Sequence, residues 1–513
     1  MRVRRFLAAL VGLVASVLVV FPGVAPAAAP VQAGYEPRFE SAPCPTLPEP
    51  LPPLREALPT ARCGFLIVPE NRRRPEGRTI RLAVAIVPAI SPHPAPDPIV
   101  HLTGGPGGIA IFEGPLLVKA GFNQNRDLIL MDQRGTFLSQ PALTCPVIDR
   151  FNIRLIRRRY DSESTRRRHV AATRSCRRQL VRRGIDIAAY NTTENAADLA
   201  DLRRALGIAQ WNVFGVSYGT DLALTLVRDH PEGIRSVVLD STVPPNVVSL
   251  PRFWPNARDG FNALFRACAA QRRCHRKYPR LKRTFTRLVH RLESRPARIT
   301  VRNPRTRRRT KVVLDGGALV NWLVAMSFAT PSYKYVPSWI AKLAAGKPKS
   351  VAASRAGQTA PPGLTGYGLT YGVGCREWTP FARKRSILAA GRRALPGYPA
   401  SVLAQAPQFP YFYDDCRVWD VPRAPAAFRR PVKSRIPTLI LSGSFDAVTS
   451  LAWARAAART LPNSRIVRIP GVGHFVVPES PCAQEVVATF LARPDAPDTS
   501  CVASLRPPAF VTP

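Results

Sequence analysis

The sequence lacks the patterns on which several kinds of binding site depend. None of its ten cysteines stands in a C-x-x-C pair, and the one cysteine beside a histidine, Cys274, has no partners in a zinc pattern. The arginine runs lack interleaved aromatic residues, which argues against a specific nucleic-acid partner. Beyond the amino-terminal region no segment is apolar enough to cross a bilayer, and no internal repeat is apparent. We therefore expect a globular chain that needs no metal ion or other cofactor.

The amino terminus and the cysteines both indicate export. Residues 1–29 have the pattern of a signal peptide: arginines at 2, 4 and 5, an apolar run over 6–21, and alanines at 27–29 as a cleavage site. An uncleaved membrane anchor is the alternative, although the run is shorter than the roughly 20 residues of a span. Cysteines in an exported chain favour disulfides. Pairing nearest neighbours along the chain joins 44 with 63, 145 with 176, 268 with 274, 375 with 416 and 482 with 501, but the sequence leaves other pairings open. We expect a protein that is secreted or associated with the cell envelope.

Acidic residues are scarce. The chain has 33 Asp and Glu against 74 Lys and Arg, a formal net charge of +41, with arginine runs at 157–159, 166–168 and 307–309. A surface of this kind attracts anionic polymers. A solvated basic surface is the first interpretation, and electrostatic contact with an anionic cell envelope is the alternative.

One pentapeptide predicts nucleophilic catalysis. Gly215-Val216-Ser217-Tyr218-Gly219 follows an apolar run at 211–214 and precedes a helical pattern over 220–228. This is the strand-turn-helix setting of a nucleophile elbow, a strained turn whose small neighbours let strand and helix approach closely. A plain glycine turn is the alternative. The prediction is that Ser217 is the nucleophile.

A serine nucleophile needs a histidine base and a carboxylate that orients it. His474, the one histidine in the last third of the chain, stands in a glycine-rich loop after the strand-like residues 465–469. Asp446 stands in a turn after the buried-type strand that begins at residue 438. The order Ser217, Asp446, His474 is that of the α/β-hydrolases. A loop histidine and a helix-capping aspartate are the alternatives.

Glycines after an early strand predict an oxyanion hole. The strand-like residues 99–102 lead into Thr103-Gly104-Gly105-Pro106-Gly107-Gly108. Since Pro106 has no N–H, the candidates for the donor from this loop are Gly104 and Gly105, and we predict Gly105. Tyr218, directly after the nucleophile, is expected to supply the other donor. The turn that begins at Asp132 and contains Arg134 is expected to brace this loop by a salt bridge.

Alternating strand and helix patterns predict an α/β-hydrolase core with a mostly parallel sheet covered on both faces. Strand-like runs at 64–68, 80–87, 127–131 and 235–239 join those named above, with helix-like runs at 195–206 and 450–461. The alternation of strand and helix patterns ends after residue 243. The helix-like and loop-like segments that follow predict a large, mainly helical cap inserted over the active site. The expected organisation is a signal peptide (1–29), a proline-rich extended lead-in (30–59), the first part of the core (60–243), the cap (244–436), the second part of the core (437–505) and a tail (506–513).

Together these motifs resemble the proline iminopeptidase and tripeptidyl aminopeptidase branch of the α/β-hydrolases, and within it the secreted actinobacterial tripeptidyl aminopeptidase-like enzymes. The likeness covers roughly residues 60–505 and depends on Gly104-Gly105-Pro106-Gly107, the turn at Asp132-Gln133-Arg134-Gly135-Thr136, the serine elbow, the Asp446 turn and the His474 loop. It implies a serine peptidase that acts on peptides from a free amino terminus. One departure is that His101 stands three residues before Gly104, whereas the prolyl enzymes usually read His-Gly-Gly-Pro-Gly, so strict proline preference is not implied.

An aminopeptidase must bind the ammonium group of its substrate with a carboxylate. Acidic residues in the predicted cap occur at Glu377 and at Asp414 and Asp415, and Glu377 is the first candidate; an ordinary salt-bridge partner is the alternative. Two other functions stay open, a carboxylesterase or lipase with the same triad and a non-catalytic protein that binds the envelope through its basic surface.

Overall fold

The computed structural model describes residues 35–46, 53–160, 162–359 and 361–512. The predicted signal peptide lies outside the described residues. Part of the predicted lead-in is regular structure, because Arg38–Ser41 forms strand β1 and Leu54–Ala57 forms the short helix α1.

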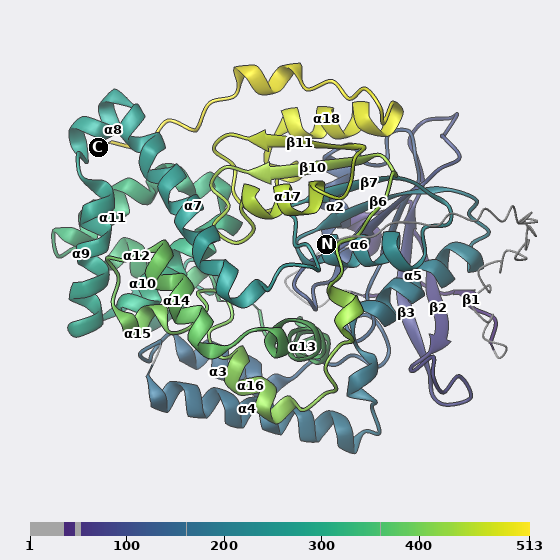
Figure 1. The fold of residues 1–513 in the computed structure, drawn as a ribbon, viewed down its shortest axis with the longest axis horizontal. Coiled ribbons are helices and arrows are strands. Elements are labelled where there is room, and N and C mark those ends of the chain that lie inside the picture. Colours follow the sequence, from purple (N-terminus) through teal and green to yellow (C-terminus); the bar gives the residue numbers. More distant parts are fainter. Residues whose placement is uncertain (1–34, 47–52, 161, 360, 513) are drawn as a thin grey trace, which may run out of the picture. The chain divides into compact units, whose positions relative to one another are not determined.

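The larger of the two sheets has nine strands (Figure 1). Its first four strands in spatial order pair antiparallel and the remaining neighbours pair parallel, which confirms the expected mostly parallel sheet. The spatial order is β1, β2 (Arg62–Pro69), β3 (Thr79–Val87), β5 (Leu128–Met131), β4 (Ile99–Leu102), β6 (Trp211–Val216), β7 (Ile234–Asp240), β10 (Thr438–Gly443) and β11 (Ser464–Ile469).

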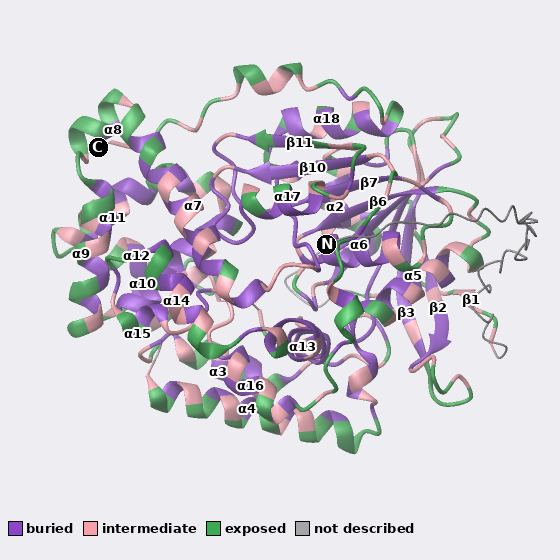
Figure 2. Ribbon diagram, in the orientation of Figure 1, coloured by how far each residue is buried: buried purple, intermediate pink, exposed green. Residues whose placement is uncertain are grey.

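Helices cover both faces of this sheet, and the side chains of each strand point alternately to one face and to the other. Leu128 and Leu130 of β5 pack with α2 (Ala110–Lys119) and α18 (Pro481–Ala492) on one face. Ile129 and Met131 pack on the opposite face with α5 (Thr192–Ala205), α6 (Tyr218–Asp229) and α17 (Leu451–Ala458). Figure 2 shows the resulting purple strands. This two-sided burial explains why an inner strand such as β5 is a continuous apolar run in the sequence, whereas the edge strands β1 and β11 carry exposed polar residues.

Residues 241–437, between β7 and β10, form an insertion with its own apolar core. The sequence predicted helices and loops here, and the structure adds a two-stranded antiparallel sheet of β8 (Ala297–Arg302) and β9 (Arg309–Leu314). Most side chains of this hairpin that face solvent are arginine, lysine or threonine, so only a few buried residues mark its strands. The insertion contains α7 (Ser249–Ala270), α8 (Arg272–Lys277), α9 (Leu281–Ser294), α10 (Gly316–Ala325), η2 (Met326–Phe328), η3 (Thr330–Tyr335), α11 (Val336–Ala344), α12 (Lys349–Gly357), α13 (Tyr367–Val373), η4 (Gly374–Trp378), α14 (Lys384–Ala394), α15 (Ala400–Leu403) and α16 (Phe412–Trp419).

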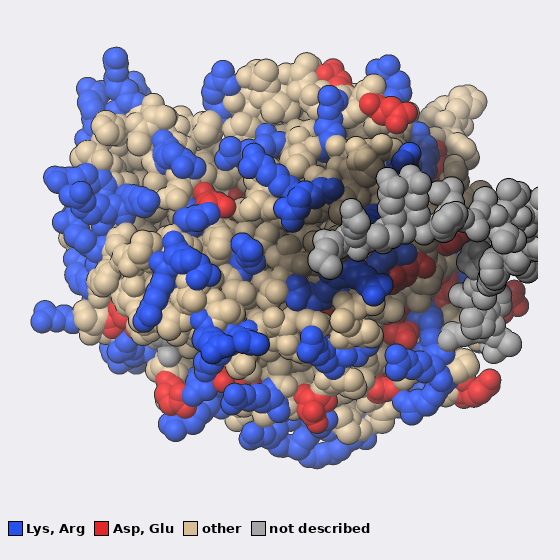
Figure 3. Space-filling model, viewed as in Figure 1, with Lys and Arg blue, Asp and Glu red and all other residues tan. Residues whose placement is uncertain are grey.

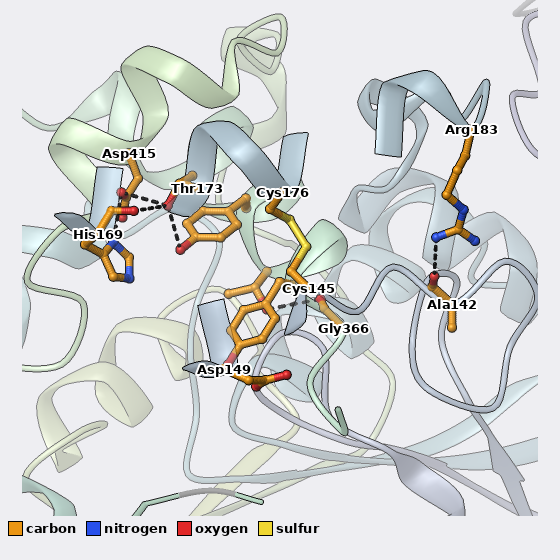
Figure 4. The surroundings of a disulfide bond; sticks show 12 residues. Ala142, Cys145, Asp149, His169, Thr173, Cys176, Arg183, Gly366 and Asp415 are labelled. Carbon is orange, nitrogen blue, oxygen red and sulfur yellow. Dashed lines mark hydrogen bonds and ion pairs between the residues drawn. A yellow bond between two sulfur atoms is a disulfide. The ribbon is translucent and has the colours of Figure 1, made fainter. Parts of the chain in front are cut away.

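Five disulfides join the cysteine pairs that the nearest-neighbour pairing predicts. One of them, Cys145–Cys176, links α3 (Pro146–Leu155) to α4 (Glu163–Arg182), and Figure 4 shows Thr173 of α4 beside it, bonded to Asp415 of α16. Helices α3 and α4 pack on the core of the insertion through this region. Across the residues that the structure describes, no helix is long and apolar enough to span a membrane.

Candidate active site

Ser217 lies in a strained turn between β6 and α6. Its φ of 56° falls in the left-handed region, which a non-glycine residue adopts only when its surroundings hold it there. Its N–H donates to the carbonyl of Asp240 at the end of β7, at 2.9 Å. A Cβ on Gly219 would lie 1.9 Å from the carbonyl oxygen of Leu102, and one on Gly215 would lie 2.5 Å from that of Gly219. The two glycines therefore permit the close approach that the elbow requires.

Asp446 and His474 are joined by a hydrogen bond. Asp446 Oδ2 lies 2.9 Å from His474 Nδ1, and both side chains are buried. The hydroxyl of Thr449 donates to the same oxygen at 2.6 Å, while the N–H groups of Val448 and Thr449 donate to Oδ1. Burial alone would raise the pKa of Asp446, but the neighbouring His474 and these hydrogen bonds hold the pKa below its usual value. The carboxylate is thus kept ionised.

The ring of His474 is oriented so that its second nitrogen is free. Nε2 is shielded from solvent and has no hydrogen-bond partner among the described residues. Hydrogen bonds hold the loop around His474 on both sides. The Asp240 carboxylate accepts the N–H groups of Val476 and Val477, each at 2.9 Å. The carbonyl of Ser327 accepts the backbone N–H of His474 at 2.7 Å. The free nitrogen is the atom that a general base needs for a serine hydroxyl.

The glycine loop after β4 lies against the elbow. A Cβ on Gly104 would come within 2.7 Å of Ser217 Cβ and 3.3 Å of its Oγ. Gly105 follows with a φ of 117°, a conformation that favours glycine. Within the described part of the chain no acceptor takes the N–H of Gly105. The loop therefore puts an unpaired backbone donor one residue from the contact with Ser217.

The predicted salt bridge to this loop is wrong. Arg134 is completely buried and instead binds Asp198 of α5 through two hydrogen bonds, at 2.7 and 2.8 Å. The loop is braced by other hydrogen bonds: Gln133 Nε2 donates to the carbonyl of Thr103 at 3.0 Å, and the Asp132 carboxyl accepts a backbone N–H from the first turn of α2. Arg134 points away from the loop because its guanidinium needs a buried carboxylate, which α5 supplies.

Glu377 lies next to the elbow, but its oxygens are occupied. It is 3% exposed, Oε1 accepts the N–H of Thr192 at 2.9 Å, and Oε2 accepts the hydroxyl of the same threonine. That hydroxyl is 2.9 Å from Tyr218 Oη, so the chain of contacts reaches the residue after Ser217. Burial raises the pKa of Glu377 to about 7. The other acidic candidates bind α4: Asp414 pairs with Arg166 at 3.0 Å and Asp415 contacts His169 at 3.0 Å (Figure 4).

Sequence reasoning missed two contributors to this site. The hydroxyl of Thr449 contacts Asp446 Oδ2 and lies 3.3 Å from His474 Nδ1. Ser327 comes from the insertion, some 120 residues before Asp446, and no motif surrounds it. A hydroxyl three residues after the acid is a signal that could have been used, whereas Ser327 had none. In the ranges that the structure describes, no three His, Cys, Asp or Glu side chains group closely enough to hold a metal ion.

A mainly parallel sheet with a serine elbow after one strand and an Asp–His pair after two later strands defines an α/β-hydrolase. The family model described as alpha/beta hydrolase fold matches residues 97–481, and the chain belongs to this family.

The chain is related to serine peptidases. The serine protease Hip1 of Mycobacterium tuberculosis is 30% identical over 232 residues, 42% of this chain and 42% of that protein. A tripeptidyl aminopeptidase of Streptomyces coelicolor is 30% identical over 196 residues, 36% of each chain. A proline iminopeptidase of Xylella fastidiosa is 50% identical over 50 residues, 10% of this chain and 16% of its own. The chain thus matches less than half the length of these curated relatives.

Proposed function

We propose that this protein is a serine peptidase in which Ser217 is the nucleophile, His474 the general base and then acid, and Asp446 the orienting carboxylate. The observation that carries the proposal is the Asp446–His474 hydrogen bond with Nε2 left free, at the same sheet edge as the strained Ser217. Ser217 Oγ attacks the carbonyl carbon while His474 takes its proton. The N–H groups of Gly105 and Tyr218 stabilise the resulting oxyanion. His474 then protonates the leaving amine, and water hydrolyses the acyl-enzyme by the reverse proton transfers.

The finer proposal is an aminopeptidase that releases residues or short peptides from a free amino terminus. It is supported by the relatives named tripeptidyl aminopeptidase and proline iminopeptidase, and by the large helical insertion. We propose that the insertion is a cap that admits only chain ends. We also propose that Glu377, in its ionised form, attracts the substrate's ammonium group, which must then take over an oxygen that Thr192 occupies. A carboxylesterase or lipase would use the same triad, because esters and amides pass through the same tetrahedral intermediate.

The deciding experiment compares three substrates with wild-type protein and with Ser217→Ala. The substrates are a peptide amide with a free amino terminus, the same peptide with a blocked amino terminus, and a short-chain ester. Cleavage of the free-amine peptide alone, lost in the variant, is the expected result. Equal cleavage of the blocked peptide would refute amino-terminal recognition, and turnover of the ester alone would assign an esterase. If no turnover depends on Ser217, the catalytic proposal fails.

A second candidate function is adhesion to an anionic cell envelope after export through the amino-terminal signal. Residues 244–436 contain 37 Lys and Arg but only 7 Asp and Glu, and of those seven acidic residues only Asp420 is exposed. Figure 3 shows blue side chains over much of one face, with few red ones. Binding of polyphosphate by Ser217→Ala, weakening steeply as salt rises, would support adhesion. Undetectable binding at low salt would exclude it.

A further inference from the structure

A short segment of the insertion is bonded to both loops of the candidate acid and base. Ser327 is completely buried. Its carbonyl accepts the backbone N–H of His474 at 2.7 Å, and its hydroxyl oxygen accepts the backbone N–H of Ala447 at 3.0 Å. Tyr333, a few residues later, donates to the carbonyl of Phe445 at 2.7 Å. These contacts fix the backbone of η2 and η3 relative to the site.

Phe328 lies within this fixed segment and yet faces solvent. Its side chain is 56% exposed, one of six large apolar side chains that are exposed in the described ranges. Its ring packs edge-on against His474, with 4.8 Å between ring centroids and 68° between the planes. The hydrogen bonds of its neighbour Ser327 fix the backbone position of Phe328. The ring itself is not buried. An exposed aromatic ring beside the proposed base is available to a ligand that covers it.

The chemistry of acylation indicates which part of the substrate reaches this ring. When the bond between the Ser217 oxygen and the carbonyl carbon has formed, the C–N bond breaks and the proton that His474 took from Ser217 passes to the leaving nitrogen. The leaving group must therefore lie against the imidazole of His474. A side chain that packs on this imidazole borders the space of the residue that follows the scissile bond.

Resting on the function proposed above, we propose that Phe328 forms an apolar subsite for the leaving group. The substrates that fit best are peptides with a large apolar side chain directly after the scissile bond. The subsite acts in acylation only, because the leaving group has departed before the acyl-enzyme is hydrolysed. A role limited to supporting His474 would instead slow both steps and all substrates alike.

The test uses free-amine peptides with a constant acyl part and either leucine or glycine after the scissile bond. Wild-type protein is compared with Phe328→Ala, with the conservative variant Phe328→Leu, and with Tyr335→Ala. Tyr335 is a matched control, since it is exposed on the same segment but stacks on Trp339. We expect Phe328→Ala to lower kcat/KM about tenfold for the leucine peptide and less than twofold for the glycine peptide. Phe328→Leu should restore most of the loss, and Tyr335→Ala should change neither substrate.

An equal fall for both peptides, or a slower hydrolysis of the acyl-enzyme formed from an ester with the same acyl part, would overturn the subsite. So would a wild-type enzyme that cleaves the two peptides equally well. These results leave the proposed peptidase intact, because they concern only the leaving group. Failure of the peptidase itself is recognised separately, by wild-type cleavage that is absent or is retained in Ser217→Ala, and it removes the basis of this inference as well.

Discussion

Replacing Glu377 by glutamine should make the folded protein less sensitive to alkaline pH. Burial raises the pKa of Glu377 from an ordinary 4.5 to about 7. Between these values the folded form holds a proton that the unfolded chain has lost, so the stabilisation from this carboxyl is complete at low pH and is lost as pH rises through the window. The difference corresponds to about 3 kcal/mol at pH 8. That amount is the extra free energy needed to ionise this carboxyl in its buried place, compared with ionising it in the unfolded chain.

Glutamine removes the charge and keeps the shape. Its carbonyl can accept the N–H of Thr192, and its amide can donate to the hydroxyl of Thr192, which can then donate to Tyr218 Oη. The variant and the wild type should therefore be about equally stable at pH 5. Above pH 8 the variant should unfold about 3 °C higher, since a chain of this length has an unfolding entropy of about 1 kcal/mol per degree. The neighbouring Asp221 adds to the effect, because burial and then the charge of Glu377 raise its pKa.

The assay is thermal unfolding at pH 5, 6.5, 8 and 9 with the disulfides intact. The exposed Glu76, changed to Gln, is the control and should follow the wild type at every pH. A difference between Glu377→Gln and wild type that is the same at pH 5 and pH 9 would refute the buried-carboxyl reasoning. The same variant tests amine recognition. If Glu377 binds the substrate's ammonium group, KM rises for free-amine peptides and not for blocked ones.

Three further substitutions test the site and its support. Thr449→Val removes a hydrogen bond to the ionised Asp446, so kcat should fall by about tenfold to a hundredfold at unchanged fold, measured by kinetics and circular dichroism. Arg134→Met leaves the buried Asp198 with fewer partners and should lower the free energy of unfolding by about 3 kcal/mol; an unchanged denaturation midpoint would contradict this. Gly473→Ala would place a Cβ 2.2 Å from a carbonyl oxygen of the insertion, so activity should be nearly lost, whereas full activity would show that this contact is dispensable.

Much of the core could be predicted because its signals are local. The run at β4 matches the structure, where all four of its residues are buried, and the run at β11 matches to within one residue although two arginines of that edge strand are exposed. The glycines of the elbow are local signals too, because close backbone approach excludes every larger side chain. The roles of Ser217, Asp446 and His474 stay predictions until the variants are measured, but their positions at one sheet edge agree with that expectation.

Other features depend on residues far apart in the chain, and only the tertiary structure decided them. Arg134 was expected to brace the glycine loop, but its guanidinium binds the buried carboxylate of Asp198 on α5. Glu377 was the first candidate for binding the substrate's ammonium group. In the structure, the N–H and the hydroxyl of Thr192 donate to its two oxygens.

By itself, then, the sequence determined most strands of the nine-stranded sheet, the elbow and the order of the candidate triad, because backbone geometry and apolar burial act over a few neighbouring residues. It did not predict β1 or the hairpin of β8 and β9. The partners of the buried charges, and the contact between Phe328 and His474, were decided by tertiary packing. A buried charge pairs with whichever group the fold brings near it, and an aromatic ring packs against whichever side chain lies beside it. The spacing of residues along the chain does not specify these partners.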